Sequence, residues 1–175
     1  ITSTAGQSDS IASYIGGGSQ LTSTGIITMN DNDSIGIYVE EGKGINSGTI
    51  TMNGAASASS KSVVGMIAKA VAGKTATIEN ATGGTITAGA NLGMYVGEDG
   101  TSIGINAGNI NVTSGTGVFV KGTSAGFNGA GGTISITGSG TGIILEGTGA
   151  GKITNAGTIA LAAGSVGVYG KSGAK

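Results

Sequence analysis

Two short motifs alternate along the chain and divide it into similar units. The first motif is Gly-Thr-Ile-Thr-Met, starting at Gly48, and the second is Gly-Ile-Tyr-Val, starting at Gly36. Relatives of the first motif begin at Gly25, Gly84, Gly108, Gly132 and Gly157, and relatives of the second begin at Gly65, Gly93, Gly117, Gly142 and Gly167. A third short apolar element, such as Ile105-Asn106, lies between them. A repeat of this length is typical of architectures in which neighbouring units stack, because one unit cannot bury its apolar side chains alone.

The period inside each element is two residues, which predicts strands. Apolar residues alternate with hydroxyl residues over 49–52, and the alternation returns over 85–87, 109–112 and 133–136. The 38 glycines and the many Ile and Thr residues disfavour helices. We therefore predict an all-β fold, a parallel right-handed β-solenoid (β-helix) of about seven coils, with about 24 residues and three strands in each. Gly and Asn at the corners would supply positive φ angles, and the right hand follows the general preference of parallel crossovers.

The alternation also predicts which side chains form the core. On the first face the inward stacks are Ile27, Ile50, Ile86, Ile110, Ile134 and Ile159, and Met29, Met52, Ala88, Val112, Ile136 and Leu161. On the second face the inward stack is Ile37, Met94, Val118, Ile143 and Val168.

One unit is about twelve residues longer than the others, and the excess falls in 55–74. Val63, Val64, Ile67, Ala70 and Val71 have the spacing of one helical face, so we predict a protruding loop or short helix, with a distorted coil as the alternative. Insertions in solenoids often carry binding. Because the chain starts with Ile and shows no signal peptide, we treat 1–175 as a single solenoid segment of a longer chain, with an insertion at 55–74.

Composition argues against several function classes. His and Cys are absent, which removes disulfides, Cys/His metal sites and catalysis that needs an imidazole. The eight cations are all Lys and the net charge is −1, so there is no basic footprint for nucleic acid. There is no apolar run of membrane-spanning length. The nine acids are scattered, unlike the paired acids of a polysaccharide-active β-helix enzyme. We expect no catalytic residue, no cofactor, no metal, no nucleic-acid partner and no membrane insertion by this segment.

One acidic stretch resembles the start of a calcium loop. Asp31-Asn32-Asp33 has Ile35 at its fifth position and Gly42 at its twelfth, which departs from the calcium-binding pattern. With Glu40 and Glu41 it would form at most a weak cation site, and we favour an acidic corner exposed to water.

The outward-facing residues suggest two kinds of surface. Stacked Thr residues on the first face raise the alternative of an ice-binding solenoid, although Asn109, Asn111 and Ala160 interrupt the array. On the second face an outward row contains Tyr14, Tyr38, Ile67, Tyr95, Phe119, Ile144 and Tyr169. We take Tyr38, Tyr95, Phe119 and Tyr169 as candidate binding residues, because exposed aromatic residues suit sugar rings or a protein partner. The alternative is that the aromatic rings stabilise the sheet by stacking on one another.

The repeated motifs resemble a known class of protein. GIYV at 36–39, GINSGTI at 44–50, GINAGNI at 104–110 and KITNAGTI at 152–159 are similar to coils in the passenger domains of type V autotransporter adhesins, especially the very large fusobacterial outer-membrane adhesins. The resemblance covers nearly the whole chain. It implies an extracellular rod on the bacterial cell surface, secreted through a C-terminal β-barrel in the outer membrane.

From the resemblance we expect a surface-exposed adhesin passenger segment that mediates attachment to other bacteria or to host cells. Its partner would be a surface protein or glycan, and the rod would be monomeric. The alternative is a purely structural spacer with no ligand of its own. An ice-binding solenoid and a polysaccharide-active enzyme are further alternatives.

Overall fold

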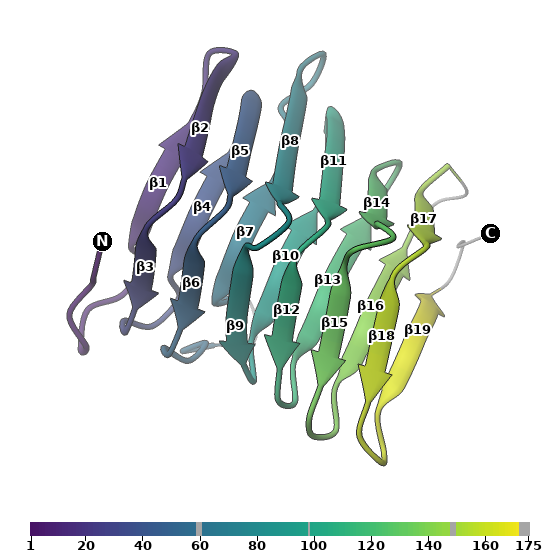
Figure 1. The fold of residues 1–175 in the computed structure, drawn as a ribbon. Coiled ribbons are helices and arrows are strands. Elements are labelled where there is room, and N and C mark those ends of the chain that lie inside the picture. Colours follow the sequence, from purple (N-terminus) through teal and green to yellow (C-terminus); the bar gives the residue numbers. More distant parts are fainter. Residues whose placement is uncertain (59–60, 98, 148–149, 172–175) are drawn as a thin grey trace.

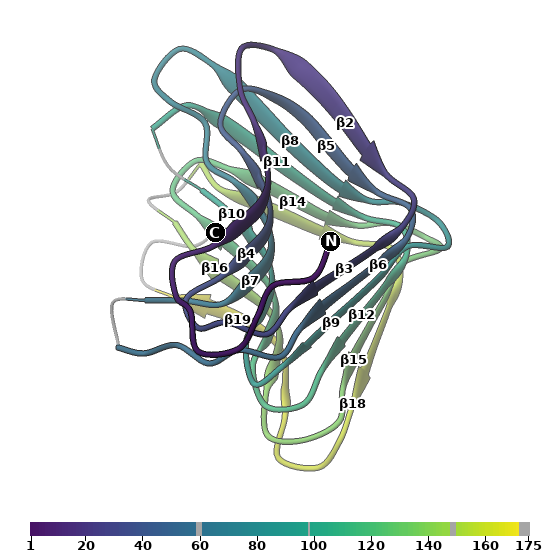
Figure 2. The same cartoon turned by 90° about the vertical axis from the view of Figure 1, so that its left-hand side faces the viewer.

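The computed structural model describes residues 1–58, 61–97, 99–147 and 150–171. Throughout this part of the chain the fold is all-β, with nineteen strands and no helix. The strands form three parallel sheets stacked as a β-solenoid of about six turns, which confirms the predicted fold class with fewer coils than expected. Figure 1 shows the strands of each sheet side by side in chain order, and Figure 2 shows two of the sheets meeting at a corner opposite the third.

Each coil contributes one strand to each sheet. Sheet 1 contains β1 (Ile11–Ile15), β4 (Ile35–Val39), β7 (Val64–Ala68), β10 (Leu92–Val96), β13 (Thr116–Lys121), β16 (Thr141–Glu146) and β19 (Val166–Lys171). Sheet 2 contains β2 (Ser19–Ser23), β5 (Gly42–Asn46), β8 (Thr75–Asn80), β11 (Thr101–Asn106), β14 (Ala125–Asn128) and β17 (Lys152–Asn155). Sheet 3 contains β3 (Ile26–Met29), β6 (Thr49–Met52), β9 (Thr85–Gly89), β12 (Asn109–Val112), β15 (Thr133–Ile136) and β18 (Thr158–Leu161).

Most of the inward stacks that the alternation predicts lie in the core, which also contains unpredicted residues such as Val39, Met66 and Val96. From Ile27 to Ile136 the predicted inward residues of the first face are at most 3% exposed. The last coil differs, because β18 and β19 are the final strands of their sheets. There Leu161 is 45% exposed and Val168 is 55% exposed, so these two predictions of burial are wrong.

The first glycine of the second motif allows sheet 1 to approach sheet 3 closely. A Cβ atom on Gly93 would lie 2.5 Å from the carbonyl oxygen of Gly117 and 2.6 Å from Cγ2 of Ile110. The same crowding, between the next coil's glycine and an isoleucine of sheet 3, recurs at the equivalent glycines Gly36, Gly65, Gly117 and Gly142. Contacts this short are essentially never made by real Cβ atoms, so this motif position accepts glycine only.

Asparagine lines the corner between sheets 2 and 3, but for a different reason from the one we predicted. Among the described residues the non-glycine positions with positive φ are Asp9, Asp33 and Asp99, and none is an asparagine of this corner. The corner asparagines form a hydrogen-bonded ladder instead, in which each side-chain amide donates to the amide oxygen of the next coil. Its members are Asn46, Asn80, Asn106, Asn128 and Asn155, at donor–acceptor distances of 2.9, 2.8, 2.8 and 2.7 Å.

The predicted insertion at 55–74 contains one strand of the solenoid. Residues 64–68 form β7, which pairs with β4 on one side and β10 on the other. Val63, Val64 and Ala70 are at most 2% exposed, whereas Val71 is 42% exposed. The described residues of this segment form no helix, and the extra length is divided between the connections 53–63 and 69–74. Residues 59 and 60 of the predicted loop lie outside the described residues.

Candidate functional site

Sheet 1 carries the predicted aromatic row on its outer face. The strand register aligns Tyr14, Tyr38, Ile67, Tyr95, Phe119, Ile144 and Tyr169 across all seven strands. Tyr14 stacks on Tyr38, with ring centroids 5.7 Å apart and an interplanar angle of 10°. Tyr95 stacks on Phe119 at 5.6 Å and 7°. The row therefore contains two stacked pairs, and Ile67 lies between them.

Groups two residues further along the strands support the rings. A Cβ atom on Gly97 would lie 2.9 Å from the Tyr95 hydroxyl oxygen, so the ring extends over this glycine. The Tyr14 hydroxyl donates a hydrogen bond to Glu40. This hydrogen bond is the main cause of a raised pKa at Tyr14, because it holds the proton on the hydroxyl. Further along, Glu146 pairs with Lys171, with Nζ 3.0 Å from Oε2.

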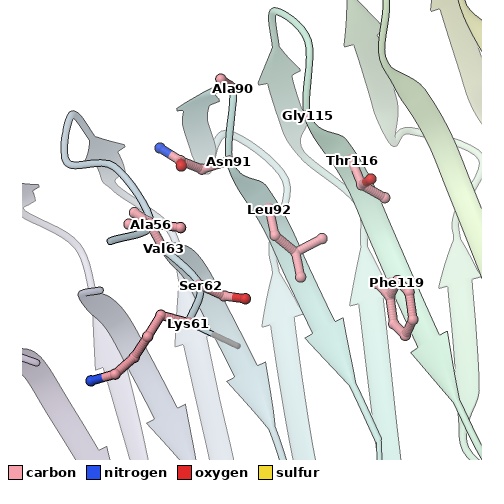
Figure 3. A pocket seen from close by; sticks show the side chains of 10 residues that line it. All are labelled: Ala56, Lys61, Ser62, Val63, Ala90, Asn91, Leu92, Gly115, Thr116 and Phe119. Atoms are coloured by element: carbon pink, nitrogen blue, oxygen red, sulfur yellow. The ribbon is translucent and has the colours of Figure 1, made fainter. Parts of the chain in front are cut away.

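Lys61 and Ser62, at the end of the connection 53–63, border two hollows on sheet 1, and Leu92 borders both of them. Val64 is 2% exposed and Ile67 is 9% exposed, so part of the outer face of β7 is covered. The first hollow is bordered by Ser62, Leu92 and Phe119. Figure 3 shows Leu92 between Ser62 and the ring of Phe119. The second hollow, of about 390 Å³, is bordered by Tyr38 and Tyr95 and has Val64 and Ile67 beneath it.

Two polar contacts anchor this connection to the first coils. Lys61 forms an ion pair with Asp9, which is 52 positions earlier in the chain. The Asp33 carboxylate accepts hydrogen bonds from Ser57, from the hydroxyl and, at 2.8 Å, from the backbone N–H. Asp9 and Lys61 could not be identified from the sequence, because neither belongs to the repeated motifs. Their pairing depends on how far the long connection reaches across the coils.

The acidic residues near 31–41 do not converge on one point. Asp31 is fully buried and accepts a hydrogen bond from Ser3, whereas Asp33 binds Ser57. Glu40 accepts from Tyr14, and Glu41 pairs with Lys74 at 3.0 Å. The expectation that this corner is exposed to water is wrong for Asp31 and Asp33, which are 0% and 7% exposed. Within the described ranges there is no group of three or more acids that could hold a metal ion.

Acid is expected to destabilise the fold through Asp31 and Asp33. Burial acts most strongly on Asp31 and raises its pKa, but hydrogen bonds from Ser10, Ser3 and its own backbone outweigh it, and the pKa is lowered. The Ser57 hydroxyl, then the Ser57 N–H, and also the Lys61 charge lower the pKa of Asp33. Because both folded-state pKa values lie below the unfolded values, the stabilisation is complete above the unfolded pKa and is lost as pH falls through the folded pKa.

We therefore expect the thermal midpoint to be steady near neutral pH and to fall progressively below about pH 4. The measurement is a series of thermal melts by circular dichroism from neutral pH downward. An Asp31→Asn/Asp33→Asn variant should start with a lower midpoint and show a shallower acid slope. A variant with the slope of the original chain would show that other groups govern acid stability.

The other two outer faces are of a different character. On sheet 3 one outward row consists of Thr28, Thr51, Thr87, Asn111, Ser135 and Ala160, which carry no charge. On sheet 2, Lys43 and Glu79 form an ion pair at 2.6 Å. Sheet 1 is thus the face on which aromatic side chains gather beside hollows, and it is the candidate binding surface.

The comparisons do not assign the chain to a family. No known protein family, curated protein or solved structure matches it. In the part of the chain that the structure describes, no helix is long and apolar enough to cross a membrane.

Proposed function

We propose that this chain is a passenger segment of a bacterial surface adhesin, and that the outer face of sheet 1 contacts a protein or glycan on another cell. The observation that carries the proposal is the alignment of Tyr38, Tyr95, Phe119 and Tyr169 in one outward row next to two hollows. Aromatic side chains offer a large, rigid contact area at a low cost in conformational entropy, which suits recognition. The solenoid scaffold would hold this row away from the bacterial surface.

A second candidate is a spacer that only extends the rod. The stacked pairs Tyr14–Tyr38 and Tyr95–Phe119 favour it, because rings that pack on one another already gain stability without a ligand. The continuous Asn ladder favours a stiff shaft in the same way. The two candidates differ in whether the row binds anything.

A cell-binding titration separates the two candidates. The purified chain would be labelled and titrated onto partner bacteria and epithelial cells. The variant replaces Tyr38, Tyr95, Phe119 and Tyr169 by threonine, which keeps strand propensity and removes the rings. The matched control changes the same number of outward residues on sheet 3, as Thr51→Ser, Thr87→Ser, Asn111→Thr and Ser135→Thr.

We expect saturable binding that falls at least about tenfold in the sheet 1 variant and stays within about twofold in the sheet 3 control, since aromatic residues dominate typical binding surfaces. Circular dichroism would establish that both variants are folded. A folded chain that binds no cell tested, or a sheet 1 variant that binds as well as the control, contradicts the adhesive function and supports the spacer.

A further inference from the structure

The hollow over Ile67 has two opposed aromatic walls. Tyr38 and Tyr95 both border it, and the register places Ile67 directly between them. Tyr38 is nearly parallel to Tyr14, and Tyr95 is nearly parallel to Phe119. The ring face that Tyr38 turns away from Tyr14 therefore points toward β7, and the face that Tyr95 turns away from Phe119 points toward β7 from the other side.

The width of this space follows from the strand spacing. Neighbouring strands lie about 4.8 Å apart, so Tyr38 and Tyr95, separated by one strand, are about 9.6 Å apart along the rod. The two stacked pairs show that rings on adjacent strands make contact at 5.6–5.7 Å between centroids. One six-membered ring placed above Ile67 would thus contact both walls. A saturated ring fills such a space better than a flat aromatic ring, because hydrogens project from both of its faces.

The side chains at the floor and the rim of the hollow indicate which class of ligand it would bind. The floor is aliphatic, with Val64 and Ile67 almost fully buried. The rim carries two carboxylates, Asp9 and Asp33, and two amines, Lys61 and Lys69. The charges of both signs among the described rim residues favour a neutral ligand, and the presence of both donors and acceptors favours a ligand with several hydroxyl groups.

From these features we infer that the hollow over Ile67 binds the pyranose ring of a neutral sugar, held between Tyr38 and Tyr95. The C–H groups on the two faces of the sugar would pack on the aromatic rings. Its hydroxyl groups would point to the rim, toward Asp33 and Lys61. This inference rests on the proposed function and names the ligand class of the same surface.

The test fills the hollow with a side chain of the protein itself. Ile67→Tyr adds a ring between Tyr38 and Tyr95 and should block the space while continuing the aromatic row. The matched control is Ile144→Tyr, which adds the same atoms to the same row on β16, where residue 144 does not line the hollow. Thermal melts of both variants would show that they are folded, and Tyr95→Leu, which removes one wall, is a second variant.

The probes are the methyl pyranosides of glucose, galactose, mannose and N-acetylglucosamine, with p-cresol as a mimic of an aromatic side chain. Binding to the purified chain is measured by saturation-transfer NMR and titration calorimetry. We expect at least one pyranoside to bind in the millimolar range, with affinity reduced about tenfold or more by Ile67→Tyr and by Tyr95→Leu, and changed less than about twofold by Ile144→Tyr.

Two results would overturn the inference: no pyranoside binds, whether or not p-cresol binds, or a pyranoside binds Ile67→Tyr as well as it binds Ile144→Tyr. The cell-binding titration distinguishes this failure from failure of the proposed function. Cell binding that persists in Ile67→Tyr, when the purified chain binds no pyranoside, would refute the sugar site and leave the adhesive function standing. Sugar binding by a chain that attaches to no cell would refute the adhesive function and leave the sugar site standing.

Discussion

Replacing Asn106 by alanine is expected to lower the free energy of unfolding by about 3 kcal/mol, because a link in a buried ladder is lost. The Asn80 amide would lose its 2.8 Å bond to the Asn106 oxygen, and the Asn128 oxygen would lose its 2.8 Å donor. Asn106 is fully buried, so water cannot replace these partners without disturbing the corner. For a chain of this size the thermal midpoint should fall by roughly 10 °C.

Asn109→Ala is the matched control for this prediction. It removes the same atoms three positions later, from an exposed residue on the outer face of sheet 3. Its effect should stay within about 0.5 kcal/mol, as is usual for surface substitutions away from special features. Urea and thermal unfolding of the two variants measure the difference. If the two substitutions proved equally costly, the ladder would not be the source of the stability that we assign to it.

The aromatic row and the core could be predicted from the sequence because both depend on short-range patterns. Alternation places Tyr95 and Met94 on opposite faces of one strand, and the repeat of the second motif aligns Tyr95 with Phe119 in the next coil. Neither step requires knowledge of how the corners turn. The burial of Val168 was predicted wrongly because the alternation does not indicate which coil is the last of its sheet.

The role of the corner asparagines could not be read from the sequence, although their recurrence is visible there. Positive φ and side-chain hydrogen bonding both favour Asn near a turn, and composition does not separate them. The structure separates them, since Asn80 and Asn106 share a hydrogen bond and neither has positive φ. The spacing of the apolar residues over 63–71 also predicted a helical face. The pattern is accidental, because some of these residues belong to β7 and others to the ends of the two connections beside it.

The two hollows on sheet 1 could not be predicted from the sequence. They depend on Lys61 reaching Asp9 and on Ser57 reaching Asp33, contacts between a connection outside the repeat and the first coils. Such pairs leave no periodic signal. The repeat indicates only that the aromatic row is interrupted at Ile67. The hollow over Ile67 is also bordered by Lys61 and Ser62 of the connection, which the repeat does not place.

Gly93→Ala is expected to destabilise the fold by about 3 kcal/mol, at the upper end of the range for overpacked cores. The added methyl group would meet the carbonyl oxygen of Gly117 at 2.5 Å and Cγ2 of Ile110 at 2.6 Å. The first contact is with backbone of the adjacent coil, so β10 and β13 would have to separate. At a strand position without these contacts, a Gly→Ala substitution would instead stabilise the fold, because alanine lowers the conformational entropy of the unfolded chain.

Two further variants show which contact is responsible. Gly25→Ala is the matched control, since a Cβ atom there meets nothing within 4 Å, and it should be neutral or slightly stabilising. Gly93→Ala/Ile110→Ala removes the side-chain contact but keeps the clash with Gly117. Because backbone cannot move aside as a side chain can, we expect the double variant to be no more stable than Gly93→Ala in urea unfolding. A double variant restored to the stability of Ile110→Ala alone would place the constraint in the packing of sheet 1 on sheet 3 rather than in the stacking of successive coils.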